Sequence, residues 1–153
     1  MHEALFYQAG DDGQVNCNLC SHRCTIKPGK RGICGVRENR GGILYTLVYG
    51  MLVAENCDPV EKKPLFHFLP GSSSYSISTV GCNFRCLHCQ NYNISQFPLI
   101  NDGQIMGTLR SPEDVVNAAQ ETDCKSISYT YVEPTIFYEF ARDCSVLAHE
   151  RGI

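Results

Sequence analysis

Residues 75–153 alternate strand-like and helix-like segments, and this order constrains the fold more than any other feature of the sequence. YSISTV at 75–80 and SISYTYV at 126–132 are rich in β-branched and aromatic residues, which predicts two short strands. SPEDVVNAAQET at 111–122 opens with an N-cap serine and a proline, and EPTIFYEFARDCSVLAHERG at 133–152 has apolar residues at helical spacing. Strands alternating with helices predict an α/β fold with parallel strands and reactive loops at the strands' carboxyl ends.

A cysteine-rich loop directly follows the first of these strands. In GCNFRCLHCQN, Cys82, Cys86 and Cys89 have the spacing C-x3-C-x2-C. Structural zinc takes four ligands, and a typical electron-transfer iron–sulfur cluster takes four thiolates. Three thiolates on one loop can instead hold three irons of a [4Fe-4S] cluster and leave the fourth iron open, as catalytic metal sites do. The alternative is a zinc site with His88 as the fourth ligand, although these ligands would have to converge within a very short segment.

This loop resembles the radical S-adenosylmethionine (SAM) signature, C-x3-C-x-aromatic-C, at the end of the first strand of a βα series. The resemblance implies that Cys82, Cys86 and Cys89 hold a [4Fe-4S] cluster whose open iron is chelated by the amino and carboxylate groups of SAM. The implied activity is reductive cleavage of SAM to methionine and a 5′-deoxyadenosyl radical. His88 stands where an aromatic residue usually lies near the adenine, and its imidazole can also stack.

Further segments extend the resemblance over most of the chain. They are DPVEKKPLFHFLPG, CQNYNISQ, TYVEPTIFYEF and CNLCSHRCTIKPGKRGICGVREN, and together they resemble the radical SAM protein of the AmmeMemoRadiSam system, akin to pyruvate formate-lyase activating enzymes. YVEPT lies where the superfamily binds the amino group of SAM, which implies cofactor contacts for Thr130, Tyr131 and Glu133. From the residues alone, Glu133 and Pro134 are equally well explained as a helix start.

The chain also falls short of a whole radical SAM core. Such a core has about six βα units, and this sequence supplies two of them. We therefore expect an incomplete radical SAM (βα) partial barrel, forming the N-terminal portion of an enzyme and inactive by itself. The expected organisation is a Cys-rich module at 1–42, a strand (43–49) and linker (58–74) within 43–74, and the radical SAM segment at 75–153.

Four cysteines cluster in the N-terminal module, at the spacing C-x2-C-x3-C-x9-C: Cys17, Cys20, Cys24 and Cys34. Four thiolates on short loops suit a closed zinc site or a second iron–sulfur cluster, and unmetallated thiols are the remaining interpretation. The same region has six basic residues, so a basic zinc module that binds nucleic acid is one alternative function. That alternative is disfavoured because no Phe, Tyr or Trp lies between Cys17 and Gly42 to stack on bases.

Cysteine usage and composition indicate a protein of the reducing cytoplasm. The chain has ten cysteines, and clustered cysteines there more often serve metal or redox chemistry than disulfides. Of these, Cys57, Cys124 and Cys144 stand alone and are expected to pack as small buried hydrophobes. The net charge is −3, and no segment predicts a signal peptide or a membrane span.

The expected partners follow from the implied chemistry. The sequence has no G-x-G-x-x-G fingerprint for a flavin or nicotinamide, so an external electron donor such as ferredoxin or flavodoxin is implied. Hydrogen abstraction from a backbone glycine of a protein substrate, or modification of another partner, is the implied reaction. A non-catalytic iron–sulfur or zinc binding module is the alternative function.

Overall fold

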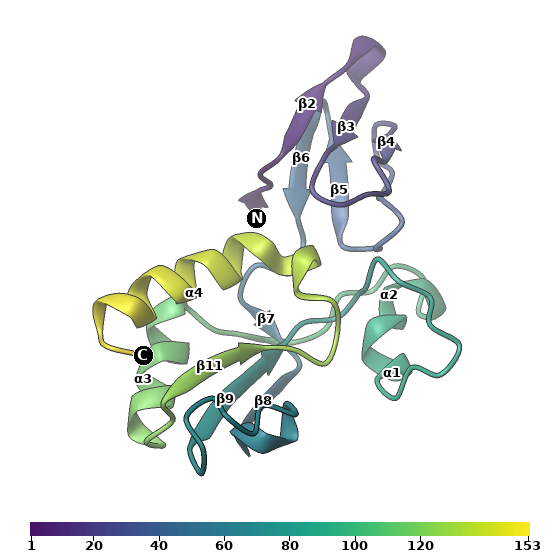
Figure 1. The fold of residues 1–153 in the computed structure, drawn as a ribbon. Helices are drawn as coiled ribbons and strands as arrows, with labels where there is room; N and C mark the ends of the chain where they lie inside the picture. Colours follow the sequence, from purple (N-terminus) through teal and green to yellow (C-terminus); the bar gives the residue numbers. More distant parts are fainter.

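The computed structural model describes residues 1–153 and shows an N-terminal β lobe beside an α/β region (Figure 1). In the α/β region, one sheet contains three strands in the order β11 (Ser126–Tyr129), β9 (Ser73–Ser78) and β8 (Ala54–Pro59). Strands β9 and β11 are parallel, which confirms the prediction from the sequence. Strand β8 pairs antiparallel with β9 and was not predicted, because its sequence, AENCDP, is polar and ends in proline.

Two helices, α3 (Pro112–Glu121) and α4 (Tyr138–Glu150), cover one face of this sheet. Their apolar side chains pack on β9 in one buried cluster that includes Tyr75, Ile77, Val115, Ala119, Phe140 and Cys144. The predicted capping box of α3 is confirmed, since Ser111 Oγ accepts from Asp114 N–H at 3.1 Å and Ser111 N–H donates to Asp114 Oδ2 at 2.8 Å. The second predicted helix begins as a short 3-10 helix, η3 (Pro134–Phe137), and continues as α4.

The N-terminal lobe contains two small antiparallel sheets. One has the strand order β1 (His2–Glu3), β6 (Ile43–Thr46), β5 (Arg37–Arg40), and the other has β2 (Tyr7–Ala9), β3 (Val15–Cys17), β4 (Thr25–Ile26), with a 3-10 turn, η1 (Asp11–Gly13), between β2 and β3. The strand predicted at 43–49 is thus present as β6, although its last residues leave the sheet. The lobe has its own small core, formed by Ala4, Val15, Cys17, Ile26 and Leu44.

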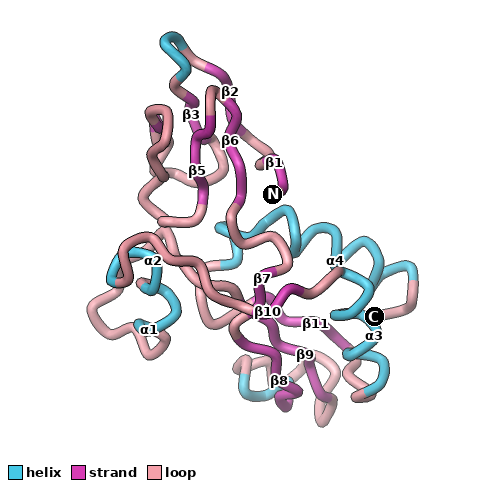
Figure 2. The backbone as a smooth tube through the Cα atoms, turned by 180° about the vertical axis from the view of Figure 1, so that it is seen from behind, coloured by secondary structure: helices cyan, strands magenta, loops and turns pink.

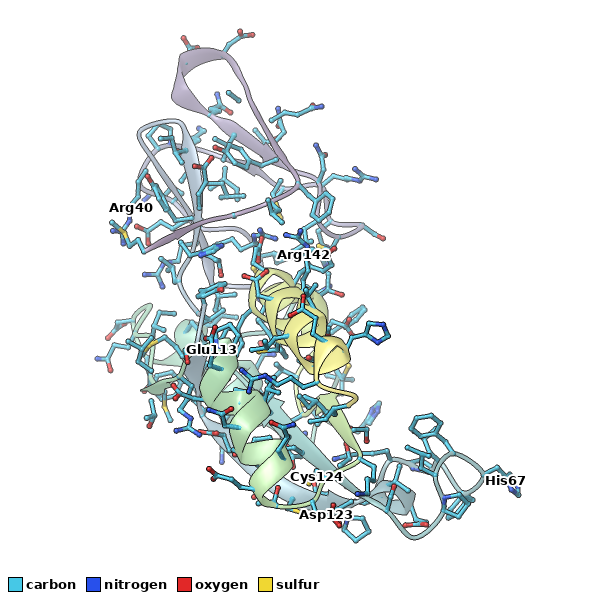
Figure 3. The ribbon with its side chains drawn as sticks, turned by 90° about the vertical axis from the view of Figure 1, so that its left-hand side faces the viewer. Arg40, His67, Glu113, Asp123, Cys124 and Arg142 are labelled. Atoms are coloured by element: carbon cyan, nitrogen blue, oxygen red, sulfur yellow. The ribbon has the colours of Figure 1, made fainter.

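The connections between these regions are short elements and loops. Strand β7 (Met51–Leu52) pairs with β10 (Thr108–Leu109), and residues 79–107 are mainly loop, with two short helices, α1 (Tyr92–Ser95) and α2 (Phe97–Ile100) (Figure 2). The expected linker at 58–74 is shorter than predicted, because it begins in β8, contains the 3-10 turn η2 (Val60–Lys62) and ends in β9. Its middle part carries His67 away from the helices (Figure 3).

The lobe and the α/β region share buried contacts. Cys34 and Val36 of the lobe pack in one cluster with Val80 and Cys82 after β9, and this cluster also contains Val48, Val132, Ile136 and Phe137. The boundary expected after residue 42 falls in the turn of the β5–β6 hairpin. The Cys-rich module and the radical SAM segment expected from the sequence are therefore packed together through this shared cluster. None of the helices has the length and apolar character needed to cross a membrane.

Candidate functional site

The cysteine loop begins where β9 ends, at the carboxyl edge of the parallel pair. Gly81 opens the loop with a φ of +91°, and its N–H donates to the carbonyl of Ile94 at 3.0 Å. Cys82 is buried, Cys89 is half-buried and Cys86 is exposed. The three predicted cluster ligands thus lie on one loop that is anchored at its buried end.

A second loop, residues 130–133, follows β11 at the same edge of the sheet. Tyr131 has a φ of +67°, a left-handed conformation that is uncommon outside glycine and tends to occur at functional sites. Asn91, at the end of the cysteine loop, donates through Nδ2 to the carbonyl oxygen of Tyr131 at 2.9 Å. This hydrogen bond joins the two loops, and Asn91 was not among the site residues predicted from the sequence.

The two loops line one cavity of about 770 Å³. Among its lining residues are six of the predicted site residues: Cys82, Cys86, Cys89, Thr130, Tyr131 and Glu133. His88 is exposed and does not line this cavity, so the structure does not bring it to the other six. The shared cavity and the Asn91–Tyr131 hydrogen bond confirm the expectation that the two loops lie side by side.

Glu133 precedes a helix, which is one of the two interpretations that the sequence left open. It is the N-cap residue of η3, and Pro134 is the first residue of that helix, as a helix start predicts. Its carboxylate also lines the cavity and accepts a hydrogen bond from Thr135 Oγ1 at 2.7 Å. A negatively charged group therefore stands at the cavity wall, where it can attract a cationic ligand group.

A buried carboxylate on β8 holds further side chains that line the cavity. Asp58 accepts hydrogen bonds from Lys62 (2.8 Å), Lys63 (2.9 Å), Ser76 (2.9 Å) and Tyr131 (2.8 Å). The Nζ of Lys63 also lies 5.1 Å from the centre of the Tyr131 ring, a cation–π distance. Asp58 therefore fixes the aromatic side chain and both lysines that line the cavity. The sequence signal was DPVEKKP, which places Asp58 four and five residues before two lysines.

Asp58 should make stability depend on pH. Burial alone would raise its pKa, but the hydrogen bonds from Lys62, Lys63, Tyr131 and Ser76 outweigh burial and hold the pKa well below its usual range. Because the pKa of Asp58 is lower in the folded state, the ionised carboxylate stabilises the fold fully when the pH is above the unfolded-state pKa of about 3.9. This stabilisation is lost progressively as the pH falls below that value. We expect Asp58→Asn to cost about 1–3 kcal/mol at pH 7 and less at pH 3.

Urea unfolding at pH 7 and pH 3 checks this prediction. The matched control is Asp123→Asn, because Asp123 also pairs with a lysine but its side chain is 86% exposed. That variant should unfold close to the wild type at both pH values. An Asp58→Asn variant that loses equal stability at both pH values would contradict the role of the ionised carboxylate.

The N-terminal cysteines surround a second, much smaller cavity. Cys17, Cys20, Cys24 and Cys34 all line an enclosed space of about 20 Å³. Burial raises the pKa of the Cys17 thiol and raises that of Cys34 to about 11. No three His, Cys, Asp or Glu side chains are arranged to coordinate a single metal ion in this structure. Zinc or a second cluster at these thiols remains a prediction from the four cysteines that line this cavity.

The N-terminal lobe packs directly against the cysteine loop. His22, between Cys20 and Cys24, makes a 2.7 Å hydrogen bond through Nε2 to the carbonyl of Asn83. Arg85 donates to the carbonyl oxygens of Ile33 and Cys82. The two cysteine-rich loops therefore support each other, which their separation in the sequence did not reveal.

Replacing Gly81 should loosen this junction. A Cβ there would lie 2.4 Å from Val36 Cγ1 and 2.9 Å from the carbonyl oxygen of Cys34, in a backbone conformation that strains any L-residue. We expect Gly81→Ala to cost about 2–4 kcal/mol in the free energy of unfolding, measured by urea denaturation. Gly29→Ala is the control, because Gly29 has a similar φ of +72° and no atom within 4 Å of the added Cβ. Equal costs for both variants would mean that the contact with Val36 is unimportant.

Three basic residues of the lobe form ion pairs within the chain. Arg37 is buried against Glu139, and Arg31 and Arg40 both pair with Glu38. Half of the six basic residues between 23 and 40 are thus neutralised by neighbours.

The fold and the site together define an α/β protein with a three-thiol loop at the carboxyl edge of a parallel strand pair. The sequence profile of the Radical SAM superfamily matches residues 76–153, and the chain belongs to this superfamily. Its members typically use a [4Fe-4S] cluster and SAM.

Two curated proteins of Methanocaldococcus jannaschii are similar to this chain. Uncharacterized protein MJ0808 is 50% identical over 153 residues, which is 100% of this chain and 45% of the relative. Uncharacterized protein MJ0674 is 33% identical over 82 residues, 53% of this chain and 19% of the relative. The chain thus spans less than half the length of either relative. No solved structure matches the chain significantly.

Proposed function

We propose that this chain is the N-terminal part of a radical SAM enzyme that cleaves SAM reductively. The observation that carries the proposal is the shared cavity of about 770 Å³, lined by Cys82, Cys86 and Cys89 from one loop and by Thr130, Tyr131 and Glu133 from the next. A cavity of this size matches the range of small-molecule sites. In this proposal, residues 75–153 are the first two βα units of a partial barrel, and residues 1–42 are a Cys-rich metal-binding module.

The three thiols of the loop suit a cluster better than a single ion. They line one cavity, and three thiolates can hold three irons of a four-iron cube while the fourth iron stays open to a small molecule. Phe84 N–H donates to Cys82 Sγ at 3.4 Å, and Ser95 Oγ lies 3.5 Å from Cys89 Sγ. These contacts orient two of the sulfurs and would lower the electron density on them. When bound and reduced, the cluster supplies one electron to the sulfonium of SAM.

The second loop supplies groups suited to the amino acid end of SAM. The carboxylate of Glu133 is positioned to attract the ammonium group, and Thr130 and Tyr131 lie beside it on the cavity wall. The ring of Tyr131 is held by Asp58, so its position is fixed before a ligand binds. His88 lies on the exposed part of the cysteine loop, and we propose that it contacts the adenine only when the rest of the protein closes this side.

The closer resemblance to the AmmeMemoRadiSam protein and to pyruvate formate-lyase activating enzymes extends the proposal to the substrate. It favours hydrogen abstraction from a protein substrate, with electrons from a cytoplasmic ferredoxin or flavodoxin. The four N-terminal thiols would hold zinc or a second cluster with a structural role, because they line a small enclosed cavity of their own.

Anaerobic reconstitution with iron and sulfide tests the proposal. Electron paramagnetic resonance (EPR) of the dithionite-reduced protein should show a [4Fe-4S] signal that shifts when SAM is added. A cluster signal indifferent to SAM would contradict a SAM-binding site in this chain. Retention of zinc without any cluster would favour the alternative, a non-catalytic metal-binding module.

A further inference from the structure

Two cysteines that stand alone in the sequence are neighbours in the structure. The Sγ atoms of Cys57 and Cys124 lie 3.2 Å apart, although the residues are separated by 67 positions. Cys57 is on β8 and is exposed, contrary to the expectation that it packs as a buried hydrophobe. Cys124 and Cys144 are buried, as expected. The pair lies away from the cavity of the candidate site, because neither residue is among its lining residues.

Backbone hydrogen bonds fix the positions of both cysteines. Cys57 pairs with Tyr75 across β8 and β9. Cys124 lies just beyond the end of α3 (Figure 3), where its N–H donates to the carbonyl of Ala119 at 2.9 Å. The N–H of Lys125 donates to the carbonyl of Ser73 on β9 at 2.9 Å. The backbone is therefore bonded to β9 at Cys57 itself and at the residue after Cys124.

Only a small movement of the two sulfurs is needed before a disulfide bond can form. A disulfide bond is about 2.05 Å long, so the sulfurs must approach by about 1.2 Å. Strand β8 is an edge strand of the sheet and is bonded on one side only, which allows a small adjustment there. Cys144 offers a contrast, because it is fully buried in the same core cluster as Cys124 but its sulfur is not within hydrogen-bond distance of another thiol.

We propose that Cys57 and Cys124 are a site of covalent modification, at which organic disulfides convert the two thiols into an internal disulfide by thiol–disulfide exchange. The exposed Cys57 thiolate attacks one sulfur of the reagent, which releases one thiol and leaves a mixed disulfide on Cys57. The Cys124 thiolate then attacks the Cys57 sulfur and expels the second thiol. The two cysteines lose two electrons and two protons, and the reagent gains them as two thiols.

The order of these steps follows from exposure. Burial raises the pKa of the Cys124 thiol, so this residue is a poor first nucleophile toward a reagent in solvent. It is well placed to attack a mixed disulfide on its neighbour, where no diffusion is needed. The product would tie the edge strand β8 to the start of β11 across β9. Because Asp58 follows Cys57 on β8, the link would also restrain the strand that positions Tyr131.

Peptide mapping of the folded chain after treatment with oxidised glutathione tests the proposal. Trypsin should place Cys57 alone in peptide 41–62 and Cys124 alone in peptide 111–125, so the link appears as one cross-linked pair of peptides. We expect this pair to dominate among linkages that involve Cys57, Cys124 or Cys144, and to disappear on reduction. In Cys124→Ser, Cys57 should instead retain glutathione, and Cys144→Ser should form the link as the wild type does.

The same treatment in 6 M guanidinium chloride is the control for geometry. Without the fold, Cys57 should be linked to many cysteines and the preference for Cys124 should be lost. If folded wild-type protein retains glutathione on Cys57 as Cys124→Ser does, or links Cys57 mainly to other cysteines, the proposal is wrong. Neither readout depends on a cluster or on SAM, so this test is independent of the proposed function.

Discussion

Cys86→Ala is expected to leave the protein folded but without the SAM-responsive iron–sulfur cluster. Cys86 is exposed, so its side chain contributes little to packing, whereas Cys82 is 7% exposed and belongs to the core shared with the N-terminal lobe. Loss of Cys86 therefore removes one of three thiolates without a large effect on stability. With two protein ligands left, a four-iron cluster is no longer held.

Iron and sulfide content and the reduced EPR spectrum after anaerobic reconstitution measure this effect. The SAM-dependent shift of the signal is the decisive readout, because a second cluster at the N-terminal thiols would not respond to SAM. The matched control is Cys57→Ala, another exposed cysteine, which should keep the SAM-dependent signal. A SAM-responsive signal in Cys86→Ala would refute the assignment of the three-cysteine loop.

Local patterns in the sequence predicted much of the α/β region. The capping box at Ser111 and Asp114 and the apolar periodicity of the last helix depend on residues a few positions apart, and both were confirmed. The parallel pairing of β9 and β11 followed from the order of strand and helix. That order also placed the cysteine loop beside Tyr131 and Glu133, since carboxyl ends of parallel strands share one edge.

Contacts between distant segments could not be predicted in the same way. Asp58 and Tyr131 are 73 positions apart, and Cys57 and Cys124 are 67 apart. Neither pair has a local pattern, because the partner of each residue depends on the antiparallel edge strand β8. That strand is polar and ends at Pro59, so its composition argued against a strand. The site walls were therefore predicted only where they follow β9 and β11.

The largest expected effect on stability comes from the ion pair between the lobe and the α/β region. Arg37 of β5 and Glu139 of α4 are each at most 2% exposed and form a buried ion pair. Glu139 also accepts from the backbone N–H of Leu5 at 2.7 Å, and Arg37 donates to the carbonyl of Leu5 at 3.0 Å. Glu139→Ala would leave the Arg37 guanidinium buried without its counter-charge. We expect a loss of about 3–5 kcal/mol in the free energy of unfolding.

Urea denaturation of Glu139→Ala and of Glu150→Ala checks this expectation. Glu150 is an exposed residue of the same helix, and its replacement should change the unfolding midpoint only slightly. If the two variants unfold at similar urea concentrations, the buried pair does not hold the regions together.

A double variant separates the cost of an unpaired charge from the value of the pair itself. The Nε and Nη1 atoms of Arg37 and Oε2 of Glu139 have no hydrogen-bond partner in the chain, so desolvation is poorly compensated. Replacing both partners by apolar residues, as in Arg37→Met with Glu139→Leu, removes that cost. It leaves the Leu5 N–H without its acceptor and the Leu5 carbonyl without the Arg37 donor. The double variant should therefore be more stable than Glu139→Ala and within about 1–3 kcal/mol of the wild type. If the double variant has the same free energy of unfolding as Glu139→Ala, apolar packing cannot replace the ion pair. The charges themselves would then join the lobe to α4.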